Sequence, residues 1–181
     1  MDDATRTDTA DLEGAAGRRD LPGLTQALAD ATVGDEVRAV FLSRRHGAFL
    51  VDGIVREGVG GALKVGGVLL TDSARRPDKE LRRLGPHADA DEPDAVPFEL
   101  PPHGALVRAV FDHETHGRVA LTGVATEGAA DDLLVVGGWV VGHDGTWAPR
   151  LVSLTVLAAA DAHDFVRPPR RESLSFGATE E

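Results

Sequence analysis

The residues best suited to chemistry lie in the string DHETHG, which begins at Asp112. The imidazoles of His113 and His116, with a carboxylate of Asp112 or Glu114, are groups that zinc and related metals accept as ligands. The matching string LSRRHG, seventy residues earlier, keeps only His46, at the place of His116. A metal site that arose before a duplication would be present in both strings. We therefore interpret DHETHG as a turn between strands and keep a metal-dependent protein as a weaker alternative.

No other string predicts a catalytic centre. The glycine-rich stretch REGVGGALKVGG lacks the Gly-Lys-Ser/Thr ending of a phosphate-binding loop, and its glycines are typical of hairpin turns and bulges. The chain has no Gly-x-Ser-x-Gly string, and the absence of cysteine excludes thiol catalysis and disulfides. We expect a protein that is not an enzyme and uses no cofactor.

Seven basic residues of the first half could form one positive surface. Two follow the run EVRAVFL and five lie in the string ARRPDKELRRL. The simplest interpretation is a solvated loop, but such a surface would also dock an acidic protein or nucleic acid, or be covered by an acidic part of the same chain. With six Phe and two Trp residues, the chain has few stacking platforms for single-stranded nucleic acid. The predicted partner-binding residues are Arg44, Arg45, Arg75, Arg76, Lys79, Arg82 and Arg83.

Trp147 is the remaining predicted partner contact. It lies in the loop string HDGTWAP, where an exposed indole would anchor a partner. Packing of the indole against its own domain is the more common outcome. Trp139, the other tryptophan, stands where the first half has Val68, so we expect it in the wall or core of the fold.

A duplication explains most of the pattern of the chain. The segments 34–58 and 104–128 are identical at eleven of 25 positions, at a constant offset of 70. One inserted residue raises the offset to 71, and ALKVGGVLL then aligns with LLVVGGWVV. Chance rarely yields so many ungapped identities followed by a shared Val-Gly-Gly. We infer two copies of one unit.

Each copy consists of short alternating runs separated by glycine-containing turns, which is typical of antiparallel strands. Glycines inside the second and third runs indicate bends or bulges, as tightly curled sheets require. In strand spacing, with a helix before a glycine-bent second strand, each copy resembles the small Sm-like and SH3-like β-barrels. The Asp and Asn typical of Sm nucleotide pockets are not evident. The resemblance implies two barrels, over 34–84 and 104–157; the alternative is that both copies merge into one larger barrel or sandwich.

The remaining segments are mostly polar. The string DLPGLTQALADA places leucines at helical spacing after Asp20, a potential N-cap, and predicts a short helix. The ends lack an apolar period, and four prolines with an acidic run interrupt the middle. We thus predict a mainly all-β protein with one short N-terminal helix and disordered ends. Its parts are an acidic disordered tail at 1–19, the helix and first repeat at 20–84, a linker at 85–103, the second repeat at 104–160 and a C-terminal tail at 161–181.

The net charge of −11 is unevenly distributed. The first repeat has 10 Lys/Arg and 7 Asp/Glu over 34–84, and the second has 3 and 6 over 104–158. The repeats therefore cancel, and overall acidity disfavours a general nucleic-acid binder. No apolar run approaches the roughly 20 residues that span a bilayer. The polar, acidic start is unlike a secretory signal, so we expect a cytoplasmic protein without membrane contact.

These observations favour a non-enzymatic protein-interaction or assembly module. The opposite charges of the two repeats would suit contact with a protein partner or self-association. The alternative is RNA or DNA binding through the basic residues of the first repeat.

Overall fold

The computed structural model describes residues 3–15, 17, 19–71, 79–87, 101–128, 133–143 and 146–160. In this part of the chain, α1 (Asp3–Ala15) and α2 (Leu21–Asp30) precede the strands. The first repeat contains β1 (Glu36–Ser43), β2 (Gly47–Ile54), β3 (Arg56–Glu57), the short 3-10 helix η1 (Val59–Gly61), β4 (Leu63–Val65), β5 (Val68–Leu69) and β6 (Lys79–Pro86). The second contains β7 (Leu106–His113), β8 (Gly117–Val124), β9 (Thr126–Glu127), β10 (Leu133–Val136), β11 (Trp139–His143), β12 (Thr146–Trp147) and β13 (Leu151–Ala158).

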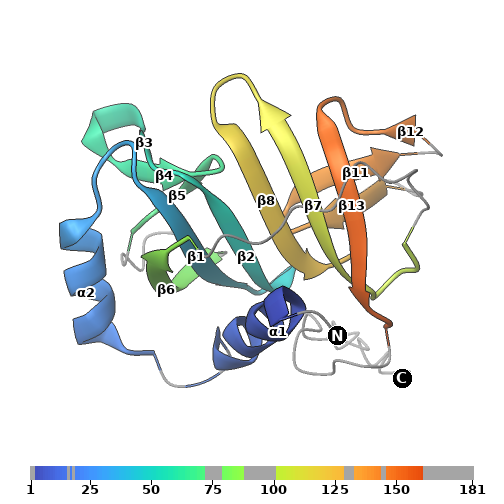
Figure 1. The fold of residues 1–181 in the computed structure, drawn as a ribbon, viewed down its shortest axis with the longest axis horizontal. Coiled ribbons are helices and arrows are strands. Elements are labelled where there is room, and N and C mark those ends of the chain that lie inside the picture. Colours follow the sequence, from blue (N-terminus) through green and yellow to red (C-terminus); the bar gives the residue numbers. More distant parts are fainter. Residues whose placement is uncertain are drawn as a thin grey trace, which may run out of the picture.

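Six strands form one antiparallel sheet in the order β13–β7–β8–β2–β1–β6 (Figure 1). The pair β2–β8 joins the two repeats. Smaller sheets contain β3–β4–β5 and β9–β10–β11–β12. None of the described sheets closes into a barrel, so the two barrels expected from the sequence are not confirmed. The structure shows a mainly β fold with two helices, in which strands of both predicted repeats share one sheet. An alternating strand satisfies its pattern by pairing within its own copy or across copies, which is why the sequence left both open.

Equivalent strands pair in the same register in the two repeats. Phe41 of β1 lies opposite Phe49 of β2, and Phe111 of β7 lies opposite Val119 of β8, 70 residues later on both strands. Phe41 and Phe111 are both buried, as predicted. The Phe41 ring stacks on Phe49 with centroids 5.3 Å apart, whereas Phe111 lies 5.2 Å from the ring of Trp139. The expected wall position of Trp139 is consistent with this contact.

The large sheet packs on both of its faces. Alternate residues such as Val37, Ala39 and Phe41 point into the main core, which also receives apolar side chains from the two small sheets. The opposite face, here called the α1 face, holds a second apolar cluster beneath α1, with Leu12 and Ala15 from the helix. Figure 1 shows α1 lying across this face of the sheet.

α1 corrects the prediction of disorder for residues 1–19. Leu12 is fully buried and Ala15 is 2% exposed. Asp8, one turn of the helix before Leu12, is also 2% exposed. The buried stripe of this helix is therefore partly acidic, and the apolar period that indicates a helix is too sparse to detect. Its stability comes from tertiary contacts, because an isolated helix of this length is marginal in water.

The helix predicted after Asp20 is confirmed as α2, and the Asp20 carboxylate accepts a hydrogen bond from Gly23 N at 3.3 Å. β6 is longer than the sequence indicated: it has eight residues, as β13 has, and takes in Gly85 and Pro86 of the predicted linker. His87 follows β6 and is also described, whereas residues 88–100 of the linker and the predicted tail at 161–181 lie outside the described residues. Within the described ranges, no helix has the length and apolar content to cross a bilayer.

Candidate functional site: a buried charge cluster and the pocket beside it

A cluster of charged side chains lies buried at the centre of the α1 face. Arg38 of β1 and Asp52 of β2 are opposite each other in the β1–β2 register. Arg38 Nε donates to Asp52 Oδ1 at 2.7 Å, and Arg38 Nη2 donates to Asp52 Oδ2 at 3.0 Å. The two residues are only 6% and 2% exposed. This two-pronged geometry is what a buried ion pair needs to offset its desolvation.

Arg108 of β7 joins the second repeat to this cluster. Its Nη1 donates to Asp52 Oδ2 at 3.1 Å, to Asp8 Oδ2 at 3.3 Å and to Thr122 Oγ1 at 3.4 Å. Thr122 of β8 lies opposite Arg108 in the sheet. Asp52 therefore holds an arginine from each repeat, and Thr122 occupies the position in the second repeat that Asp52 occupies in the first.

α1 completes the cluster with carboxylates. Asp8 Oδ1 lies 2.7 Å from Arg38 Nη1, and Asp11 Oδ2 lies 3.3 Å from the same nitrogen. Burial raises the pKa of Asp8, although the charges of Arg38 and Arg108 act in the opposite direction. For Arg38, burial lowers the pKa, but the hydrogen bonds and attraction to Asp52 and Asp8 outweigh it and leave the pKa above its ordinary value. The cluster therefore ties α1 to both repeats.

No sequence pattern predicted this charge cluster. Its one local signal is an arginine kept at the same place in both copies of VRAVF, where neighbouring residues are apolar. Arg38 and Arg108 both pair with Asp52 and Asp8, which explains why each position holds an arginine. Asp8, however, lies in the segment that the sequence predicted to be disordered. An ion pair between residues this distant in sequence has no periodic signature.

The predicted basic residues lie in different surroundings. Arg44 and Arg45 are exposed in the β1–β2 turn, whereas Lys79 Nζ lies 5.8 Å above the Phe49 ring. Arg75 and Arg76 lie outside the described residues.

The two β6 arginines contact the N-terminal segment. Arg83 Nη1 donates to Asp11 Oδ1 at 2.6 Å, and Arg82 donates to the carbonyl of Gly17 and pairs with Glu80 at 3.0 Å. Asp11 thus pairs with Arg83, whose side chain nevertheless remains 70% exposed, and coverage of the basic residues by an acidic part of the chain stays a prediction. Nucleic-acid binding through these arginines stays a prediction.

Trp147 belongs to β12 and is half-buried. It packs against the edge of the main core, next to Gly142. This is the packing role that the sequence analysis weighed against a partner contact, and partner binding by Trp147 stays a prediction.

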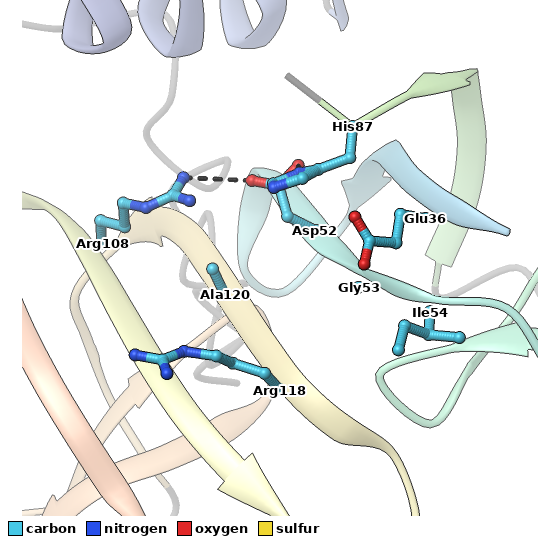
Figure 2. A pocket seen from close by; sticks show the side chains of 8 residues that line it. All are labelled: Glu36, Asp52, Gly53, Ile54, His87, Arg108, Arg118 and Ala120. Atoms are coloured by element: carbon cyan, nitrogen blue, oxygen red, sulfur yellow. Dashed lines mark hydrogen bonds and ion pairs between the residues drawn. The ribbon is translucent and has the colours of Figure 1, made fainter. Parts of the chain in front are cut away.

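A pocket of about 130 Å³ opens on the α1 face beside the charge cluster (Figure 2). Arg108 and Arg118 reach it from β7 and β8, Glu36 and Ile54 from β1 and β2, and Ala120 lies between them. Its other lining residues are Asp52, Gly53 and His87. Arg108, which is paired with Asp52, and Arg118 line one side of the pocket, and Glu36 lines the other. Such a lining can hold a small polar group through hydrogen bonds and charge, without covalent chemistry.

The string DHETHG forms the β7–β8 turn, as predicted. The His113 and His116 rings stack with centroids 4.5 Å apart, and Glu114 pairs with Arg150. Burial lowers the pKa of His116. In the part of the chain that the structure describes, no group of three or more His, Cys, Asp or Glu side chains is placed to hold a metal ion. The described geometry therefore does not assemble the metal site considered from sequence.

Comparisons with protein-family models, with curated proteins and with solved structures find no match for this chain. We therefore infer its function from the cluster, the pocket and the sheet edges themselves.

Proposed function

We propose that this protein is a non-enzymatic assembly module: an internal duplication whose outer strand β13 pairs with β13 of a second copy. The contrast between the two outer strands of the large sheet carries this proposal. β6, with the sequence KELRRLGP, is charged and ends in proline, whereas β13, with the sequence LVSLTVLA, has no charged residue. Figure 1 shows the two strands at opposite ends of the sheet.

The strand registers support the duplication. Five residue pairs of β1–β6 recur in β7–β13 at a constant offset of 70; Phe41 opposite Leu81, for example, recurs as Phe111 opposite Leu151. The β2–β8 pair is symmetric under the same offset, because Val51 lies opposite Leu121, its own equivalent. An approximate two-fold axis between these two strands follows, so the repeats associate as the subunits of a symmetric dimer would.

The Val-Gly-Gly turns of the two repeats support the same symmetry. A Cβ at Gly66 would lie 2.8 Å from the side chain of Val119 in the second repeat, and a Cβ at Gly137 would lie 2.7 Å from Phe49 in the first. Both glycines have positive φ, 51° and 58°. Each repeat thus places a glycine turn against the sheet of the other, where a side chain has neither the space nor the backbone conformation.

Equivalent positions explain how the two sheet edges differ. Arg83 and Pro86 of β6 correspond to Ser153 and Val156 of β13 at the offset of 70. Proline lacks the N–H that an added strand would need, and charge also discourages edge pairing. Val156 is 49% exposed. Among the described residues, β13 pairs with β7 alone and is an edge strand of the large sheet.

A second copy is the occupant that this edge fits. Two antiparallel β13 strands would bring no like charges together, and the regular stretch from Ser153 to Val156 lies between bulges near each end of the strand. The molecule already extends its sheet by antiparallel pairing across an approximate two-fold axis at β2–β8. Pairing at β13 would repeat that arrangement between chains and form one continuous sheet.

The test is the molar mass of the full chain, measured by light scattering after size exclusion over a range of concentrations. The chain mass is 19.0 kDa, and we expect a dimer that dissociates on dilution. Val156→Pro copies the residue that β6 has at the equivalent position, so it should remove the outward N–H while the pairing with β7 persists. Val156→Arg places a charge at the exposed position of the same edge, and both variants should be monomeric.

Val59→Arg is the matched control. Val59 is fully exposed in η1, so the substitution adds the same charge at a site away from the β13 edge. Its mass should equal that of the wild type. A wild type that is monomeric at every concentration, or edge variants that remain dimeric, would overturn the proposal. Circular dichroism of each variant reports whether the sheet is retained.

A further inference from the structure

The α1 face carries different side chains on its two equivalent halves. Four residues beneath α1 belong to the second apolar cluster, and their equivalents 70 residues away all line the pocket of Figure 2. The pairs, with the residue beneath α1 first, are Ala48 and Arg118, Leu50 and Ala120, Leu106 and Glu36, and Val124 and Ile54. The pocket therefore lies where the approximate symmetry would place a second α1.

The residue differences at these positions replace the apolar surface on which α1 packs by a polar pocket. Alanine at 120 in place of leucine removes volume from the floor of the sheet. Arg118 and Glu36, in place of alanine and leucine, put opposite charges on the two sides of the space, as Figure 2 shows. Neither charge would suit the apolar contacts that Leu12 and Ala15 make in the other half.

We propose that this pocket binds a free α-amino acid, with the ligand carboxylate on Arg108 and Arg118 and its ammonium group on Glu36. The two arginines approach from β7 and β8 and the glutamate from β1, so the pocket has the charge pattern of a receptor for a small zwitterion. Ile54, Ala120 and Gly53 leave an apolar surface for a small side chain.

Arg108 is the anchor of this site because it is fixed before a ligand arrives. It is 7% exposed, and all of its hydrogen bonds to described residues use Nη1. We assign Nε and Nη2 of Arg108 to the ligand carboxylate. A guanidinium held by Asp52 and Thr122 loses little conformational entropy on binding, and its hydrogen bonds to a carboxylate are charge-assisted.

The size of the pocket selects a small ligand. Its volume of about 130 Å³ exceeds what one water needs, about 10–15 Å³ on a comparable measure. It is well below the roughly 300–1,000 Å³ of pockets for drug-sized molecules. A molecule of a few heavy atoms fits, which favours glycine, alanine or valine over larger amino acids.

The experiment is isothermal titration calorimetry of the full chain with glycine, alanine, valine and leucine at up to millimolar concentration. Two analogues separate the charges: alaninamide lacks the carboxylate and N-acetylalanine lacks the ammonium group. We expect at least one free amino acid to bind, and both analogues of alanine to bind about tenfold more weakly than alanine, as the loss of one charged contact implies. Absence of binding by all four amino acids, or equal binding of N-acetylalanine, would overturn the proposal.

Variants locate the site. Arg118→Gln and Glu36→Gln should each weaken binding by about tenfold, and Ala120→Leu should abolish it by filling the floor of the pocket. Arg45→Gln, which neutralises an exposed arginine in the β1–β2 turn, should bind as the wild type does. Unchanged binding by Arg118→Gln or Ala120→Leu would place the ligand elsewhere and overturn the proposal. None of these residues lies on β13, so the result is independent of the assembly test.

Discussion

The two halves of the α1 face share one backbone arrangement and differ in what lies above it. One half supports α1 through Leu50, Leu106 and their neighbours, while the other has no equivalent helix among the described residues and holds a pocket. On the core face, Phe41 and Phe111 or Ala39 and Ala109 remain identical. The difference teaches that equivalent positions of the two halves hold the same residues where both pack into the core, and different residues where α1 covers only one half.

The charge cluster lies at the boundary of the two halves, so its removal should have the largest effect on stability. Asp52→Asn leaves Arg38 and Arg108 without their shared carboxylate, and breaking a buried pair in this way costs about 3–5 kcal/mol. Urea unfolding should show this loss. Thr122→Val, at the equivalent position, removes two long hydrogen bonds, one from Arg108 and one to Asp8, both at 3.4 Å, and should cost only about 1–2 kcal/mol. Equal losses would mean that Asp52 is not the centre of the cluster.

Leu50 beneath α1 and its equivalent Ala120 in the pocket should respond differently to substitution. Leu50 is fully buried beneath α1, so Leu50→Ala should cost about 2–5 kcal/mol through lost burial and a cavity. Ala120 is also buried, but the pocket beside it can accept part of a larger side chain, so Ala120→Leu should cost no more than the lower end of the about 1–3 kcal/mol typical of added core volume. Thermal unfolding of both variants measures the asymmetry. A large loss for Ala120→Leu would show that the two halves are equally packed.

The glycine turns, in contrast, should respond alike in the two halves. Gly66→Ala and Gly137→Ala both force a side chain into a left-handed backbone conformation and against the opposite repeat. We expect the free energy of unfolding of each variant to fall by about 1–3 kcal/mol. The left-handed backbone conformation alone accounts for about 1 kcal/mol of this loss. Chemical unfolding of the two variants tests the symmetry. A loss confined to one variant would argue against reciprocal packing of the repeats.

The smallest expected effect concerns the turn that carries the two stacked histidines. Because burial lowers the pKa of His116 below its usual 6.5, the unfolded chain takes up the proton more readily than the folded chain. Stability is then fully present above pH 6.5 and decreases as the pH falls through this value. Urea midpoints at pH 8 and pH 5.5 measure the decrease, and His116→Gln should reduce it.

The raised pKa of Asp8 contributes with the opposite sign. Protonation of this buried carboxyl favours the folded state as the pH falls.

Much of the strand pattern was predictable from local sequence. Alternation and glycine punctuation predicted β1, β2 and their equivalents, and leucine spacing with Asp20 predicted α2. The candidate site was not predictable in the same way. Glu36, Arg118 and Ala120 are ordinary strand residues in sequence, and they form a pocket only because β2 pairs with β8.

The sequence by itself determined most of the strands and the burial of Phe41 and Phe111, because short-range alternation gives each strand one apolar face that must be buried. Tertiary structure decided which repeat β2 would pair with, and it decided that residues 3–15 would form a helix. Both outcomes depend on contacts distant in sequence: the Val51–Leu121 pairing in one case and the ion pairs of Asp8 with Arg38 and Arg108 in the other. Such contacts are favourable only when burial has removed the competing water, and no local pattern records that.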